Sequence, residues 1–138
     1  MALTYVADVS ALSRLHHDDV RARVEPLFLH GRVALCRLTW LELLSRCRRQ
    51  SDHAEVLEDL GTLPVLPTGE EVLARAIEVQ TLLATTGRHR AVGPSELVVA
   101  ASAELSGAVV LHYDPAFDLV AEATGQPTEW VATRGTVP

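Results

Sequence analysis

The sequence predicts an α/β protein in which helices cover both faces of a central, mainly parallel sheet of four to five strands. Three observations predict this fold class. Short apolar runs alternate along the chain with segments of helical periodicity. The runs are apolar at successive positions, which is typical of strands buried on both faces of a parallel sheet. The 138 residues are 48% hydrophobic, which is enough for the core of one domain and excludes a disordered chain. We therefore expect a single domain over residues 1–138.

Three strands and three helices are predicted in the first half of the chain. The strands are the apolar runs at residues 3–7, 33–36 and 63–67. The third lies near a sheet edge, because its prolines cannot donate hydrogen bonds to a neighbouring strand. The helices cover residues 18–30, 39–47 and 51–60. Gly31 ends the first helix, and the spacing of Thr39 and Glu42 at the start of the second fits a capping box.

The second half of the chain continues this alternation. Residues 68–71 fit a second capping box, and apolar residues on one face extend that helix to Gly87. Pro94 stands where the first residue of the next helix belongs. A fourth strand is predicted at residues 108–113 and a further helix at 115–124. Residues 128–131 would add a fifth strand at an edge, and we expect residues 132–138 to form a loose tail.

The charge of the chain is unevenly distributed. Its net charge of −6 argues against a protein that binds nucleic acid through bulk charge. Residues 14–49 nevertheless hold eight arginines, whereas residues 51–78 are strongly acidic. A positive surface for a partner and ordinary solvated helix faces both fit this pattern, and the sequence leaves the two interpretations open.

Four acidic residues stand at comparable places in the predicted topology. Asp8 follows the first strand and Asp114 follows the fourth. Glu42 and Glu96 lie in the first turns of predicted helices next to the second and fourth strands. Because ligands of parallel α/β sheets bind beyond the carboxyl ends of the strands, we expect a carboxylate site there, suited to Mg²⁺ or Mn²⁺. Each acid also has a local explanation as a helix cap or first-turn residue, which stays open.

The chain contains no Lys, and this absence excludes two other acid-rich α/β classes. Phosphoacceptor receiver domains and haloacid-dehalogenase phosphatases both need a Lys, and the latter also need an Asp where Ser10 stands. No Walker P-loop or GxGxxG motif is present. No apolar stretch is long enough for a membrane span and no signal segment opens the sequence, so we expect a cytoplasmic protein.

Several segments resemble PIN-domain ribonucleases, and among them the VapC toxins of bacterial toxin–antitoxin pairs. These segments are residues 5–12, 39–44, 92–103, 112–118 and 121–127. The resemblance spans residues 3–131 and implies a three-layer α/β/α fold, dependence on Mg²⁺ or Mn²⁺ and endonucleolytic cleavage of RNA. It places the catalytic, metal-binding acids on Asp8, Glu42, Glu96 and Asp114. Ser10 matches a position that often assists at the metal.

The resemblance also implies partners, namely an RNA substrate, a cognate antitoxin and a second copy in a homodimer. The arginines that we expect to contact RNA are Arg14, Arg46, Arg88 and Arg90. The chain departs from the family pattern at Glu96, where Asp is usual, and at Ala116, where a further acid is common. Asp118 is the candidate substitute for that acid. A degenerate PIN domain that binds RNA or protein without cutting, and an RNA-processing nuclease without an antitoxin, remain alternatives.

Overall fold

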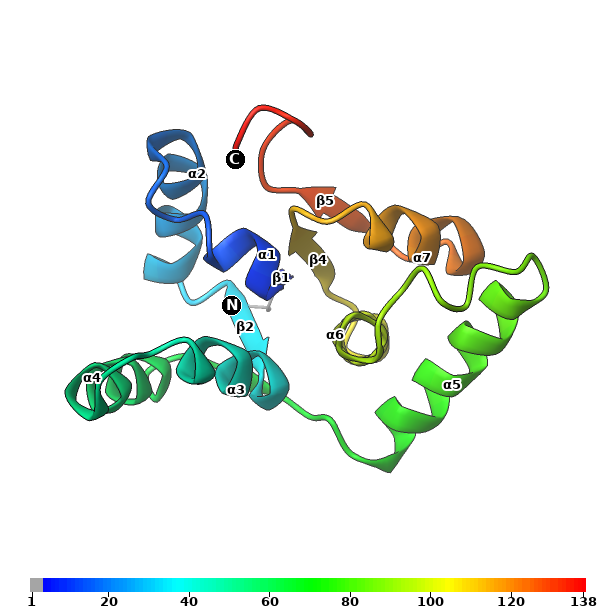
Figure 1. Cartoon of the computed structure of the whole chain (residues 1–138), viewed down its shortest axis with the longest axis horizontal. Helices are drawn as coiled ribbons and strands as arrows, with labels where there is room; N and C mark the ends of the chain where they lie inside the picture. The colour runs from blue at the N-terminus through cyan, green and yellow to red at the C-terminus, as the bar shows by residue number, and fades with distance from the viewer. Residues whose placement is uncertain (1–3) are drawn as a thin grey trace.

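The computed structural model describes residues 4–138, and the predicted alternation of strands and helices is present (Figure 1). The strands are β1 (Tyr5–Ala7), β2 (Val33–Cys36), β3 (Val65–Leu66), β4 (Val109–His112) and β5 (Thr128–Trp130). The helices are α1 (Val9–Leu12), α2 (Asp18–Leu29), α3 (Arg37–Ser45), α4 (Gln50–Leu60), α5 (Glu70–Ala84), α6 (Pro94–Leu105) and α7 (Ala116–Thr124). Leu3, the expected first residue of the first strand, lies outside the described residues.

The five strands form one parallel sheet in the order β3-β2-β1-β4-β5. The central strand β1 aligns Val6 with Ala34 of β2 and with Val110 of β4. β3 lies at one edge, as its prolines predict, and β5 confirms the fifth strand at the other edge. Since β1 and β4 are parallel neighbours, the residues that follow them meet at the same edge of the sheet.

Successive strand residues face two different helical layers, because side chains alternate between the faces of a sheet. Val6 and Val110 pack in a core with α5, α6 and α7. Ala7 packs with residues of α3 and α4, and Leu111 packs with α1 and α2. Figure 1 shows α6 end-on, with α2, α3 and α4 on its left and α5 and α7 on its right. The apolar strands therefore serve two cores, as the sequence predicts.

The two capping boxes that the spacing predicts are wrong. α3 begins at Arg37 with Cys36 as its N-cap, so that Glu42 lies in the second turn. Thr39 is instead buried, with 1% of its surface exposed. α5 begins at Glu70, and its N-cap Gly69 makes no side-chain cap hydrogen bond. Because β2 leads directly into α3, the helix begins earlier than predicted, and the Glu42 carboxylate takes no part in capping it.

Two segments are more ordered than the sequence predicts. The turn after β1 is the short helix α1, capped by Asp8. The expectation of a loose tail at residues 132–138 is wrong, because the Tyr113 hydroxyl oxygen accepts hydrogen bonds from the backbone N–H groups of Gly135 (2.8 Å) and Val137 (3.0 Å). Both anchors join residues more than 20 positions apart, which local patterns do not reveal. Within residues 4–138, no helix has the length and apolarity to cross a membrane.

Candidate active site

Asp8 lies at the carboxyl end of β1 and is almost completely buried, with 4% of its surface exposed. Its Oδ2 accepts two hydrogen bonds from Ser10, one from the backbone N–H (3.0 Å) and one from the hydroxyl (2.6 Å). Both hydrogen bonds go to the same oxygen, and none from residues 4–138 reaches Oδ1. Asp8 therefore caps α1 with one carboxylate oxygen, and the other takes no part in the cap.

The pKa of the Asp8 carboxyl is raised above its ordinary value. Burial is the largest cause, the hydrogen bonds from Ser10 oppose it, and repulsion from the charges of Glu42 and Asp114 adds to it. Two of the other three predicted acids, Glu42 and Asp114, therefore lie close enough to Asp8 for their charges to act on it. No ion pair within residues 4–138 involves these three carboxylates, so no Arg in contact with them there offsets their charge.

Asp114 stands two residues beyond β4 and is fixed by two hydrogen bonds. Its Oδ1 accepts the backbone N–H of Ala116 (2.9 Å), and its own N–H donates to Nδ1 of His112 (3.1 Å). Burial lowers the pKa of His112 to about 4, although the nearby charges of Asp118 and Asp114 act to raise it. His112 is thus neutral near pH 7, which leaves the Nδ1 lone pair free to accept the hydrogen bond.

Ser10 connects the ends of β1 and β4. Its hydroxyl donates to Asp8 and accepts the backbone N–H of Tyr113 at 2.9 Å. One side chain therefore links the two segments that carry Asp8 and Asp114. The auxiliary role of Ser10 at a metal stays a prediction.

Glu96 does not join the other three carboxylates. It lies in the first turn of α6, with its carboxylate turned back over Gly93, where an added Cβ would clash with Glu96 Oε2. The same oxygen accepts a long hydrogen bond from the Ser95 hydroxyl (3.4 Å). Glu96 is absent from the charges that act on Asp8, and nowhere in residues 4–138 do three Asp, Glu, His or Cys side chains lie close enough to hold one metal ion. The predicted quartet is assembled only in part.

The four arginines expected to contact RNA lie in different environments. Arg14 is next to the carboxylates, because its Nη1 donates to the Ser10 carbonyl (2.7 Å) and its guanidinium lies 4.4 Å from the centre of the Tyr113 ring. Arg88 pairs with Glu122. Arg46, at the end of α3, and Arg90, before α6, are exposed. Of the four, Arg14 is the one that contacts a residue bonded to Asp8, through the carbonyl of Ser10.

Asp118, the candidate substitute for a further acid, serves a different purpose. Its Oδ1 accepts the indole N–H of Trp130 at 3.0 Å. It acts electrostatically on His112 but is not among the charges that act on Asp8. Asp118 therefore holds an aromatic side chain at the neighbouring strand end in this structure.

Comparison with known proteins supplies the family. A model of the PIN domain matches residues 5–123. The chain belongs to the PIN-domain family. This PIN domain is similar to Ribonuclease VapC21 of Mycobacterium tuberculosis, with 40% identity over 141 residues and 99% of each chain covered. It is also similar to Ribonuclease VapC2 of the same species, with 48% identity over 132 residues and 94% of each chain covered. The resemblance to VapC proteins is thereby confirmed.

A solved structure agrees with the architecture of this PIN domain. A DNA-bound VapBC complex from Salmonella typhimurium matches with a TM-score of 0.77 at 19% identity, covering 94% of this chain and 99% of that chain. At this level of identity the likeness concerns the fold. It confirms the three-layer α/β/α arrangement that the resemblance implies.

An aromatic cluster lies beside Asp114, and the sequence patterns did not predict it. The His112 ring centre lies 4.9 Å from that of Phe117 and 5.0 Å from that of Trp130, and the Tyr113 ring stands edge-on to Trp130 at 5.3 Å. A signal was present, since half of the six Phe, Trp and Tyr residues of the PIN domain fall within residues 113–130. Their meeting depends on the pairing of His112 with Trp130 across β4 and β5, which composition does not reveal.

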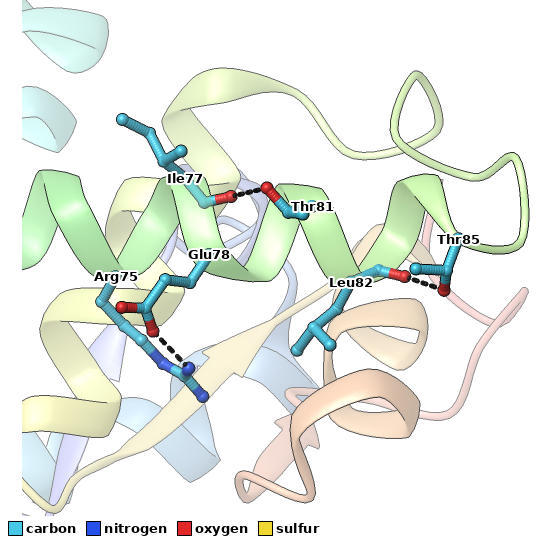
Figure 2. Close-up of a pocket in the computed structure, with 6 residues that line it drawn as sticks. All are labelled: Arg75, Ile77, Glu78, Thr81, Leu82 and Thr85. Atoms are coloured by element: carbon cyan, nitrogen blue, oxygen red, sulfur yellow. Dashed lines mark hydrogen bonds and ion pairs between the residues drawn. The ribbon is translucent and has the colours of Figure 1, made fainter.

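An open hollow on the outer face of α5 contains none of the predicted site residues (Figure 2). It is lined by Arg75, Ile77, Glu78, Thr81, Leu82 and Thr85. The hydroxyls of Thr81 and Thr85 donate to carbonyls of their own helix, at 2.9 and 2.6 Å, and Arg75 pairs with Glu78. Its polar groups already have partners, so this hollow of the PIN domain fits a contact surface better than a reaction centre.

Proposed function

We propose that this PIN domain is a metal-dependent endoribonuclease and the toxin of a toxin–antitoxin pair, acting in the cytoplasm. The observation that carries the proposal is the buried Asp8 carboxyl, whose pKa is raised in part by Glu42 and Asp114 at the same sheet edge. Mg²⁺ and Mn²⁺ bind carboxylate oxygens and neutralise such excess charge. The VapC relatives are named ribonucleases, which supports RNA as the substrate.

The acids fit a hard divalent cation in donor type and in charge. Asp8, Glu42 and Asp114 would hold the ion after their carboxylates move closer together than they lie in this structure. Glu96 would join them after rotation about its side-chain bonds away from Gly93. When bound, the cation lowers the pKa of a water and offsets charge on the scissile phosphate.

The chain's own side chains position the carboxylates and the RNA. Ser10 donates both of its hydrogen bonds to one oxygen of Asp8, so the other oxygen is not used in capping α1. The Ala116 N–H holds one oxygen of Asp114 in the same way. Arg14, anchored on the Ser10 carbonyl, is placed to bind an RNA phosphate, because a guanidinium can donate to two phosphate oxygens.

Cleavage of RNA by the purified chain tests this proposal. With Mn²⁺ we expect the wild-type chain to cut single-stranded RNA, EDTA to stop cleavage, and Asp8→Asn to reduce the rate by at least about 100-fold. The matched control is Asp19→Asn, which removes the same charge from an exposed residue of α2. A wild-type chain that neither cuts RNA nor binds Mn²⁺ in calorimetry would contradict the proposal.

The orientation of Glu96 favours a second candidate, a PIN domain that binds RNA without cutting it. The two candidates predict different effects of Glu96 substitutions. In a nuclease, Glu96→Gln weakens Mn²⁺ binding by about tenfold through loss of a charged ligand, and Glu96→Asp weakens it less. In a protein that only binds, neither substitution changes the affinity for Mn²⁺ or RNA.

We propose a cognate antitoxin as the protein partner, supported by solved structural relatives that are VapBC complexes. Exposed leucines on α2, α3 and α4 offer apolar contacts, beside the arginines of residues 14–49, to an amphipathic acidic segment. These are Leu29, Leu41 and Leu57. Co-expression with the product of an adjacent small reading frame should yield a stable complex. If no adjacent product binds, the chain is an RNA-processing nuclease instead.

We also propose that a second copy packs against α5. Leu73, Ile77 and Leu82 are exposed there, and Leu73 and Ile77 line a shallow apolar groove between α5 and α6. Sedimentation velocity should show a dimer, and Ile77→Glu should shift it to the monomer. A dimer that is unaffected by Ile77→Glu would show that copies associate through another face.

A further inference from the structure

We propose that Arg14, Tyr113, Trp130 and Arg134 form a strip that binds single-stranded RNA beside the carboxylates. A base stacks on Trp130, and phosphates bind the two arginines. The inference rests on the proposed function, because RNA is the ligand that it names.

The four side chains form a continuous row. The Arg14 guanidinium lies 4.4 Å from the centre of the Tyr113 ring, and the Tyr113 ring stands edge-on to Trp130 at 5.3 Å. The Arg134 guanidinium lies 5.6 Å from the centre of the Trp130 ring. At its inner end the row meets Ser10, whose carbonyl accepts from Arg14 and whose hydroxyl bonds to Asp8. The row therefore leads away from the proposed cleavage site.

Other residues hold this row in place before any ligand binds. Trp130 donates its indole N–H to Asp118 (3.0 Å), and its carbonyl accepts a hydrogen bond from Arg23 (2.7 Å). The Tyr113 hydroxyl binds the tail on the C-terminal side of Arg134, at Gly135 and Val137. A surface that is already ordered loses less conformational entropy when it binds a flexible strand.

The chemistry of the row suits a single-stranded nucleic acid. Neither Arg14 nor Arg134 forms an ion pair within residues 4–138, whereas Arg88 and Arg23 do. Tyr113 and Trp130 are only partly buried, and Arg134 is exposed. Aromatic faces that stack bases, combined with guanidinium groups that bind phosphates, are the usual means of binding single strands. An acidic peptide would use the arginines but would have no planar group to stack on Trp130.

Tryptophan fluorescence tests base stacking directly. The chain has two tryptophans, and Trp40 is buried with 8% of its surface exposed. We expect an oligouridine to quench the fluorescence of the non-cleaving Asp8→Asn chain saturably, and Trp130→Phe in that background to abolish the quenching. Oligoglutamate of the same charge should not quench. Binding of oligouridine without quenching, or equal quenching by oligoglutamate, would overturn the strip.

Arginine substitutions test the phosphate contact. In the same background, Arg134→Ala is expected to weaken RNA affinity by about fivefold or more. The matched control Arg21→Ala removes an equal, exposed charge on α2 and should change affinity less than about twofold. Equal losses in the two variants would refute the strip. If the wild-type chain cleaves RNA but RNA does not quench Trp130 fluorescence, the strip is refuted and the nuclease proposal stands. If RNA quenches Trp130 fluorescence but the wild-type chain does not cleave it, the nuclease proposal is refuted and the strip stands.

Discussion

At the residue scale, Asp8 has opposing effects on the stability of the chain. As the N-cap of α1 it accepts two hydrogen bonds from Ser10, and such caps typically contribute about 1 kcal/mol. As a buried charge near Glu42 and Asp114, it disfavours the folded state when no cation is bound. If this residue served stability alone, an uncharged capping residue such as Asn would stabilise the fold better.

Asp8→Asn is therefore expected to raise the melting temperature of the metal-free chain at neutral pH by about 2–4 °C. Asn keeps the capping oxygen but carries no charge. Because the folded-state pKa of Asp8 is raised, folding takes up a proton, and the wild-type chain loses stability as pH rises from the unfolded-state pKa through the folded-state pKa. Thermal unfolding in EDTA measures this. A melting temperature below that of Asp19→Asn would contradict the prediction.

His112 predicts a loss of stability in acid. Its pKa falls from an ordinary 6.5 to about 4 in the folded chain, so between these values only the unfolded chain takes up the proton. Stability should thus fall as pH decreases from about 6.5 to about 4, with a slope approaching 1.4 kcal/mol per pH unit. His112→Asn keeps an acceptor for the Asp114 N–H and removes the titration. Urea unfolding at several pH values measures how the free energy of unfolding depends on pH. Equal slopes for the wild-type chain and His112→Asn would contradict the prediction.

At the scale of elements, α5 combines a buried face and an exposed face. Val72, Ala76, Val79 and Leu83 are buried against the core. Arg75 also joins α5 to α6, with its Nε 2.6 Å from Glu104 Oε1. Leu73, Ile77 and Leu82 remain exposed on the same helix. The helix therefore stabilises the fold through one face and leaves the other for a partner.

Adjacent leucines of α5 separate the two faces experimentally. Leu83 is 1% exposed and Leu82 is 45% exposed. Leu83→Ala is expected to lower the free energy of unfolding by about 3 kcal/mol, because it leaves a cavity in the core. Leu82→Ala should change that free energy by less than about 0.5 kcal/mol. Urea denaturation measures both values. A larger loss for Leu82→Ala than for Leu83→Ala would show that α5 turns a different face toward the core.

The element boundaries show which predictions from sequence succeed. Apolar runs predicted β2 and β4, because buried parallel strands need apolar side chains on both faces. The capping box at Thr39 was wrong, because burial of Thr39 outweighs its capping preference and α3 begins at Arg37. Local preference loses to tertiary packing where the two conflict.

At the scale of the whole molecule, a bound cation should stabilise the fold. Mn²⁺ at about 100 times its dissociation constant is expected to add about 2.7 kcal/mol to the free energy of unfolding. Asp8→Asn should abolish this gain while raising the stability of the metal-free chain. Thermal unfolding with and without Mn²⁺ measures both effects. An equal Mn²⁺ gain in the two chains would place the cation elsewhere.

The fold class, the family and the placement of Asp8 and Asp114 after strands could all be predicted from the sequence, because they follow from residues a few positions apart. Tertiary packing was needed to show that Glu42 and Asp114 act on Asp8, whereas Glu96 turns back over Gly93. The attachment of the C-terminal tail to the Tyr113 hydroxyl is likewise visible only in the folded chain. The direction of a side chain depends on neighbours far along the chain, as in the hydrogen bond between Ser10 and Tyr113, 103 positions apart.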